Sequence, residues 1–148
     1  MGLFSRMSTK NNEFLQHGLH NEKVCDYIDL KPEFSDWAIT TAFYSALQLV
    51  KYKIFPFKMP AIEGKQTNIE DLEDFIRYKR NNIMNKADRH QVLADLVEEY
   101  CADISEDYNW LLDMSKNARY SNYQQPKEIA GKARRLMTKI KKHCTADS

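Results

Sequence analysis

Apolar residues recur along this chain at steps of three and four, the spacing of helices that bury one face. The strongest pattern runs from Asp36 to about Ile54. Its core stripe is Ile39, Phe43, Ala46, Leu47, Val50 and Ile54. Ser35 or Asp36 can cap its start, and Pro56 ends it because proline does not suit a helix interior. A second, amphipathic face carries Trp37, Thr41, Tyr44 and Gln48.

Two further helices are expected, one on either side of this one. Residues 11–29 have a helical pattern, although Gly18 costs about 1 kcal/mol relative to Ala in a helix interior. Residues 68–84 predict a helix with an inward face of Leu72, Phe75, Ile76 and Ile83. Residues 1–10 are expected to form a flexible tail, in which Met1 or Met7 is the native start, and residues 56–67 a mobile loop.

The second half of the chain predicts one long helix and a last one. From Asp88, which can serve as an N-cap, apolar and small residues keep helical phase to about Tyr120, with a kink near Ser105. Pro126 is placed as the first residue of the last helix, which runs to about Cys144. The fold class is therefore all-α, an antiparallel up-and-down bundle of four to five helices.

Composition and cysteine content indicate the class of protein and its cellular compartment. A chain of 148 residues with 29% charged and 43% hydrophobic residues is typical of one soluble globular domain. Cys25, Cys101 and Cys144 are odd in number and have no CxxC spacing, which favours free thiols in the cytoplasm. The most apolar run, Trp37 to Val50, is shorter than a membrane span, and the N-terminus has no secretory pattern. We expect no membrane association.

Charge is unevenly distributed although the net charge is only +1. Residues 95–113 hold seven carboxylates and no Lys or Arg, whereas residues 127–142 hold seven basic groups against Glu128. In one interpretation these segments are complementary helix faces, within one chain or across a dimer. In the other, the basic helix is a phosphate-contacting surface.

Several kinds of chemistry are disfavoured. His17 and His20 are one turn apart, but no second ligand pair accompanies them, so we predict neither a metal nor another cofactor. His90, beside Arg89, is assigned to the cap of the long helix. The carboxylate pairs lie in polar settings, and there is no glycine-rich phosphate loop or GxSxG motif. A conventional hydrolase or nucleotide-binding enzyme is not indicated.

The polar end of the long helix is the candidate site. Donors and stacking faces suited to nucleic acid or phosphate binding are Lys116, Asn117, Arg119, Tyr120, Asn122 and Tyr123. A guanidinium at Arg119 can hold a phosphate, or it can pair with a carboxylate of a neighbouring helix. Alternatively, this end is an ordinary helix terminus whose polar groups satisfy carbonyls and whose tyrosines pack on the last helix.

Two blocks of the sequence resemble the HEPN superfamily of small helical domains from prokaryotic toxins, defence systems and nucleotidyltransferase partners. They are DWAITTAFYSALQLV at Asp36–Val50 and the later Tyr108, Leu111, Ser115, Ala118, Arg119 and Tyr120. His90, before Val92 and Leu93, is similar to a helix start between such blocks. The resemblance covers about residues 21–142, and residues 11–144 are expected to form one HEPN-like domain.

This resemblance implies a commonly dimeric bundle, whose active members are metal-independent endoribonucleases. Their motif is an Arg followed after four to six residues by a His, in a cleft at the dimer interface. After Arg119 the corresponding positions hold Gln124, Gln125 and Pro126, so the His is missing. We expect Trp37, Tyr44 and Gln48 to line the cleft.

The sequence therefore predicts a non-catalytic or degenerate HEPN-like domain. It would bind RNA, a nucleotide or a partner protein, such as a nucleotidyltransferase-like protein, as a homodimer. One alternative is a metal-independent endoribonuclease or toxin that uses Arg119 despite the missing His. Another is a purely structural interaction module whose acidic and basic helix faces join subunits.

Overall fold

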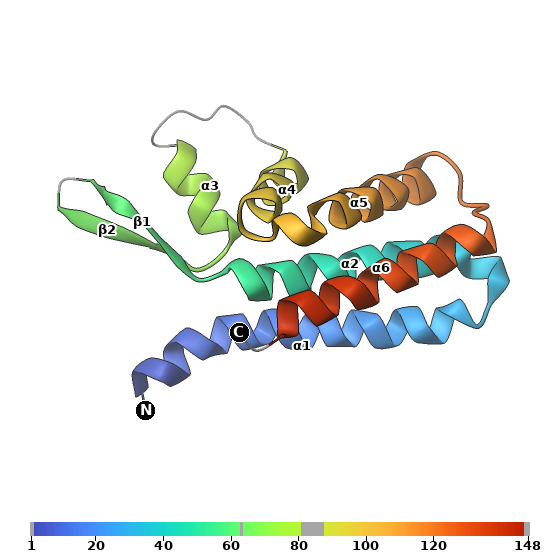
Figure 1. The fold of residues 1–148 in the computed structure, drawn as a ribbon, viewed down its shortest axis with the longest axis horizontal. Helices are drawn as coiled ribbons and strands as arrows, with labels where there is room; N and C mark the ends of the chain where they lie inside the picture. Colours follow the sequence, from blue (N-terminus) through green and yellow to red (C-terminus); the bar gives the residue numbers. More distant parts are fainter. Residues whose placement is uncertain (1, 63, 81–87, 147–148) are drawn as a thin grey trace.

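The all-α prediction is confirmed by the computed structural model, which describes residues 2–62, 64–80 and 88–146 (Figure 1). Its α-helices are α1 (Gly2–Asp29), α2 (Ser35–Ile54), α3 (Leu72–Arg80), α4 (Arg89–Tyr100), α5 (Ser105–Tyr120) and α6 (Lys127–Thr145). Short 3-10 turns, η1 (Pro32–Phe34) and η2 (Ala102–Ile104), precede α2 and α5. The two strands are β1 (Phe57–Ile62) and β2 (Lys65–Ile69).

Helix α2 is the centre of the bundle. It packs against α1, α5 and α6, and Figure 1 shows α1 and α6 alongside it for most of its length. The predicted stripe is buried: Ile39, Phe43, Ala46 and Val50 have no exposed surface, and Leu47 and Ile54 have very little. Burial of such side chains contributes about 1.5–3 kcal/mol each, so this helix accounts for much of the driving force for folding.

The first helix is longer than the sequence predicts. It begins at Gly2, whereas residues 1–10 were expected to be a flexible tail. Asn11 anchors it, because its amide donates to the carbonyl oxygens of Tyr52 and Phe55 at 2.7 and 2.8 Å, where α2 ends. An ion pair between Lys10 and Asp71 ties the same region to the segment before α3.

Gly18 allows α1 to approach α2 closely. Its carbonyl accepts a hydrogen bond of 2.8 Å from the buried hydroxyl of Ser45. A Cβ atom at this position would lie 2.8 Å from Cγ of Leu49, closer than packed carbon atoms can lie. Gly18 therefore lowers the helix propensity of α1 but allows this helix to pack closely against α2.

The expected loop at residues 56–67 is instead an antiparallel hairpin. Phe57 pairs with Ile69 and Met59 with Thr67, and Gly64 adopts a φ of +79° in the turn. Phe57 stacks on Phe55 with centroids 5.7 Å apart. It also contacts the rings of Phe75 and Tyr100. The contacts with Phe75 and Tyr100 hold the base of the hairpin, and because they join residues far apart in the sequence, no local periodicity predicts it.

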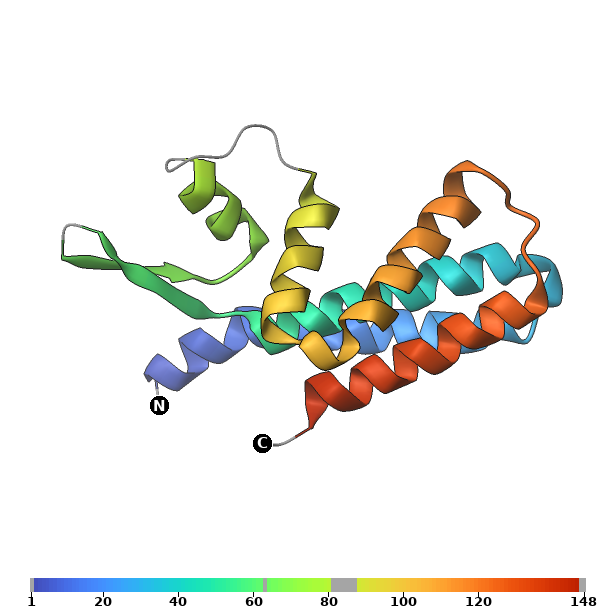
Figure 2. The same ribbon diagram turned by 45° about the horizontal axis from the view of Figure 1, so that its top comes forward.

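The long helix predicted from Asp88 is broken. Its first part, α4, ends where Cys101 takes φ −137° and ψ 50°, and α5 starts after η2, so the change of direction precedes the expected kink at Ser105. Cys101 and Ile104 are both buried at this corner. Figure 2 shows α4 and α5 as the two arms of a V that meets at η2.

The helix expected from residue 68 begins at Leu72 as α3, because Asn68 and Ile69 pair with β1 as part of β2. The remaining boundaries are close to those expected. Asp88 is the N-cap of α4, and its carboxylate accepts from the backbone N–H of His90 at 3.0 Å. Pro126 is the N-cap residue of α6, one position before the helix. Ser35 does not cap α2 but donates to the carbonyl of Pro32. The predicted inward residue Ile83 lies outside the described residues.

Candidate functional site

Arg119 is held by a tyrosine on another helix. Its Nη1 donates a hydrogen bond of 2.5 Å to the hydroxyl of Tyr44 on α2, and its Nε donates to the carbonyl of Ser115 at 3.2 Å. The guanidinium carbon also lies 5.3 Å from the ring centroid of Tyr44 and 5.0 Å from that of Tyr120. Both distances suit a cation–π interaction.

No carboxylate of the described residues forms an ion pair with Arg119. The expected alternative, a salt bridge to a neighbouring helix, is therefore not found in the described part of the chain. A phenol orients the guanidinium without neutralising its charge. No group of the described residues accepts from Nη2 of Arg119, so its N–H groups can bind a ligand, in the planar arrangement that suits a phosphate.

Of the three residues expected to line a cleft, only Tyr44 contacts Arg119. Trp37, two turns earlier on α2, is 55% exposed, and Gln48, one turn later, is half-buried. Among the described residues, neither side chain forms a hydrogen bond or ring contact with the guanidinium.

Lys116 connects the same end of α5 with the start of α4. Its Nζ lies 4.0 Å from a carboxylate oxygen of Asp88, and both side chains are well exposed. Ion pairs of this kind contribute about 0–1 kcal/mol, so Lys116 can exchange this carboxylate for a ligand at low cost.

His90 is the neighbour that the sequence did not assign to this site. Its ring lies 5.7 Å from that of Phe43, and it is half-buried. Burial lowers the pKa of His90, the charges of Arg119, Lys116 and Lys51 lower it further, and Asp88 raises it. The imidazole is therefore neutral near pH 7 and lies within electrostatic reach of Arg119. The only signal for His90 in the sequence was its similarity to a helix start between the two HEPN-like blocks.

Asn117 and Asn122 take part in the hydrogen bonds of the helix end and of the turn that follows it. The carbonyl of Asn117 accepts from the backbone N–H groups of Ser121 and Asn122 at 2.9 and 3.0 Å. The side chain of Asn122 accepts from the N–H of Gln124 at 2.9 Å, and its carbonyl accepts from Nε2 of Gln125 at 2.5 Å. The side chain of Asn117 is exposed.

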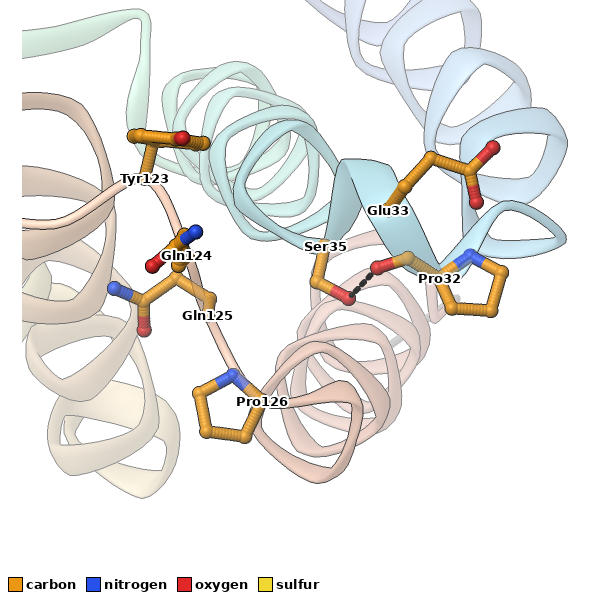
Figure 3. Close-up of a pocket in the computed structure, with 7 residues that line it drawn as sticks. All are labelled: Pro32, Glu33, Ser35, Tyr123, Gln124, Gln125 and Pro126. Atoms are coloured by element: carbon orange, nitrogen blue, oxygen red, sulfur yellow. Dashed lines mark hydrogen bonds between the residues drawn. The ribbon is translucent and has the colours of Figure 1, made fainter.

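The two tyrosines of the candidate site do not pack on the last helix. Tyr120 is 78% exposed beside Arg119, and Tyr123 is 69% exposed. Tyr123 lines a pocket of about 490 Å³ between the α1–α2 and α5–α6 connections (Figure 3). Its other lining residues are Pro32, Glu33, Ser35, Gln124, Gln125 and Pro126.

The basic helix α6 is partly neutralised by carboxylates of its own chain. Lys139 pairs with Asp107 on α5 at 2.7 Å, the one ion pair among the described residues that joins the acidic and basic segments. Arg134 pairs with Asp26 and Asp29 of α1, and Lys141 pairs with Glu22. These pairs make α6 a weaker candidate for phosphate contact than the end of α5.

Within the described ranges, no three His, Cys, Asp or Glu side chains are grouped closely enough to hold a metal ion. His17 and His20 are both exposed. None of the described helices combines the length and apolar character needed to cross a membrane. No family model, curated protein or solved structure significantly matches this chain.

Proposed function

We propose that this chain is a HEPN-like helical domain in which Arg119 binds a phosphate group of RNA or of a nucleotide. The observation that carries the proposal is the hydrogen bond from Arg119 to Tyr44, formed where no described carboxylate pairs with the guanidinium. A guanidinium already oriented by a neutral partner loses little side-chain entropy on binding and has no ion pair to break.

The surroundings of Arg119 favour an anion. Lys116 and Lys51 carry positive charge near His90, and Asp88 is the carboxylate that acts on this histidine. Tyr120 offers an exposed ring beside the guanidinium, on which a base next to the bound phosphate can stack. A phosphate with a base attached suits these groups better than an isolated inorganic anion.

The proposal extends to assembly and compartment. A homodimer would bring two copies of this site to one cleft, as the family resemblance implies, and a nucleotidyltransferase-like protein is the candidate partner. The free, buried thiols of Cys25, Cys101 and Cys144 fit a reducing cytoplasm. The pairing of Lys139 with Asp107 weakens the alternative of a purely structural module, because these charges are used within the chain.

The test is binding of a short fluorescent single-stranded RNA, measured by anisotropy at low and at physiological salt. Arg119→Ala should weaken binding about tenfold or more, since a charge-assisted hydrogen bond contributes about 1.5–3 kcal/mol. Lys116→Ala should weaken it less. Arg135→Ala removes an exposed positive charge on α6 and is the matched control, expected to change the affinity by less than about threefold.

The proposal fails if no RNA or nucleotide binds at either salt concentration. It also fails if Arg119→Ala binds as well as the unchanged protein, or if Arg135→Ala loses as much affinity as Arg119→Ala. Circular dichroism of each variant separates loss of binding from loss of fold.

His90 favours a second candidate function, a metal-independent endoribonuclease. The neutral imidazole can accept the proton of a ribose 2′-hydroxyl as its oxygen attacks the phosphorus held by Arg119. The bond from phosphorus to the 5′-oxygen then breaks, and this oxygen takes a proton from the imidazolium or from water, so the products are a 2′,3′-cyclic phosphate and a 5′-hydroxyl. The sequence lacks a histidine after Arg119, and α4 supplies one nearby.

Cleavage is tested by incubating labelled RNA with the protein in the presence of EDTA. The active protein should cut RNA but not a strand whose 2′-hydroxyls are replaced by hydrogen. His90→Ala should abolish cleavage and keep binding, whereas Arg119→Ala should lose both. Intact RNA after long incubation, together with growth unaffected by overexpression, would exclude the endoribonuclease and leave the binding function standing.

A further inference from the structure

The central helix α2 leaves one narrow stripe of its surface partly open to solvent. Within residues 38–50, all but three of its side chains are buried. Lys51 continues the spacing of these three and is half-buried as well. We call the four residues the open stripe: Thr41, Tyr44, Gln48 and Lys51. Steps of three and four place them on one face of the helix, and Tyr44 on this face holds Arg119.

Lys51 brings a positive charge to the open stripe. Its Nζ lies 5.8 Å from the ring centroid of Phe14 on α1, within the range of a cation–π interaction. None of the described carboxylates forms an ion pair with it. Burial lowers the pKa of Lys51 below its ordinary value of 10.5, since the ammonium has lost part of its hydration. An anion bound at this ammonium would replace the hydration that burial removes.

Lys51 and Arg119 differ from the other cations of this region. Three neighbouring cations each have a carboxylate partner: Lys10 pairs with Asp71, Arg89 with Glu73, and Lys116 with Asp88. Lys51 and Arg119 instead have an aromatic ring beside the charge, that of Phe14 and that of Tyr44. A ring holds a cation in place without neutralising it. The described part of this region therefore offers two uncompensated cations to a ligand.

His90 lies between these two cations. Tyr44, which holds Arg119, and Lys51 are two helical turns apart on α2, about 10 Å along its axis. Burial lowers the pKa of His90, and the charges of both Arg119 and Lys51 lower it further. An imidazole on which two cations so far apart both act lies in the space that separates them.

The separation of the two cations decides which pair of phosphates they fit. Single-stranded RNA carries a phosphate after every nucleoside, so a ribose separates consecutive phosphates of one strand. The two phosphates of a nucleoside diphosphate share one oxygen and lie much closer together. Cations held two helical turns apart suit the wider spacing of the strand better than the narrow spacing of the diphosphate.

We propose that Lys51 binds a second phosphate of the RNA strand whose first phosphate is bound by Arg119, with one nucleoside between the two; this inference rests on the proposed function. The strand runs along the open stripe of α2, and the ribose between the two phosphates faces His90. The ligand is then a single strand with at least two consecutive phosphates, and a mononucleotide fills only half of the site.

Three adenosine nucleotides test the second phosphate site when each is titrated into the protein by calorimetry at one salt concentration. Adenosine 3′,5′-bisphosphate carries a phosphate on either side of one nucleoside. It should bind about tenfold more tightly than adenosine 5′-monophosphate, the gain from one more charge-assisted contact. Adenosine 5′-diphosphate has a similar charge but the narrow spacing, and it should bind less than about threefold more tightly than the monophosphate.

Lys51→Gln removes the charge and keeps most of the stem that lies against Phe14. It should bind the bisphosphate only as tightly as the monophosphate, and Lys51→Arg should keep the preference. Lys53→Gln is the matched control, because Lys53 is an exposed lysine on the opposite side of α2. With single-stranded RNA, Lys51→Gln should weaken binding about tenfold and Lys53→Gln less than about threefold. Circular dichroism of each variant checks the fold.

Failure of this inference is distinguishable from failure of the proposed function. RNA binding that is lost in Arg119→Ala but unchanged in Lys51→Gln overturns the second phosphate site and leaves the first intact. A diphosphate that binds as tightly as the bisphosphate overturns the strand and assigns both cations to a nucleoside polyphosphate. Equal losses in Lys51→Gln and Lys53→Gln overturn the assignment to Lys51. Absence of binding by RNA and by all three nucleotides contradicts both proposals.

Discussion

The hydroxyl of Tyr44, in the middle of α2, accepts a 2.5 Å hydrogen bond from Arg119 at the end of α5. Tyr44→Phe would keep the ring under the guanidinium and remove the acceptor. We expect RNA affinity to fall several-fold, less than in Arg119→Ala, because the charge remains while its orientation is lost. Stability should fall by about 1.5–3 kcal/mol, the contribution of a hydrogen bond to a charged group. Anisotropy and urea denaturation measure the two effects.

The double variant Tyr44→Phe with Arg119→Ala provides the control for this prediction. If Tyr44 acts on the ligand through Arg119, its substitution should have no further effect on affinity once Arg119 is removed. Additive losses would show that Tyr44 contacts the ligand by a separate route.

The titration of His90 provides a test of the proposed anion site. Burial and the neighbouring cations lower the pKa of His90 below its ordinary value of 6.5. As pH falls below 6.5, the unfolded chain takes up this proton before the folded one does, so the contribution of His90 to stability decreases. Inorganic phosphate bound at Arg119 should raise the pKa of His90, since it offsets the positive charges.

Two-dimensional NMR of the imidazole, with and without phosphate, measures this change. Arg119→Ala should raise the pKa of His90 in the absence of phosphate and abolish the response to phosphate. An imidazole that titrates at the same pH with and without phosphate would place the anion elsewhere.

The fold could be predicted from sequence where signals are local. The stripe on α2 has one uninterrupted helical period, and Asp88 and Pro126 are conventional start signals, so these elements lie within one or two residues of their expected positions. The corner at Cys101 has no Gly or Pro to announce it. Burial of Cys101 and Ile104, which lie between α4 and α5 in the chain, decides it, and that is a tertiary effect.

The same distinction holds at the candidate site. Arg119, Tyr120 and Lys116 stand out in sequence because an apolar pattern ends among them. The bond from Arg119 to Tyr44 spans 75 positions and depends on how α2 and α5 pack, which no local pattern specifies. His90 was assigned to the helix cap because the cations that act on it, Arg119, Lys116 and Lys51, come from other helices.

Gly18 and Gly131 should respond in opposite directions to alanine. A Cβ atom at Gly18 would lie 2.8 Å from Cγ and 2.9 Å from Cδ2 of Leu49, so Gly18→Ala should destabilise the protein by about 1–3 kcal/mol despite the better helix propensity of Ala. At Gly131 the nearest atom, Nη1 of Arg135, is 3.5 Å away. Gly131→Ala should therefore stabilise α6 by up to about 1 kcal/mol.

Urea denaturation of both variants checks this pair. The double variant Gly18→Ala with Leu49→Ala should lose less unfolding free energy than the two single variants together, because the smaller side chain at position 49 relieves the contact. Equal stabilisation by both glycine substitutions would mean that α1 can move away from α2 without loss.

Removing the hydroxyl of Tyr108 should change stability in the opposite direction to removing that of Tyr44. It is fully buried against Phe43, with ring centroids 5.8 Å apart, and among the described residues its hydroxyl has no hydrogen-bond partner. An unsatisfied buried hydroxyl costs about 1–3 kcal/mol, whereas the ring packs equally well without it. Tyr108→Phe should therefore raise the free energy of unfolding by about 1 kcal/mol, measured by urea denaturation, while Tyr44→Phe lowers it. A loss of stability in Tyr108→Phe would instead mean that an internal water binds this hydroxyl in solution.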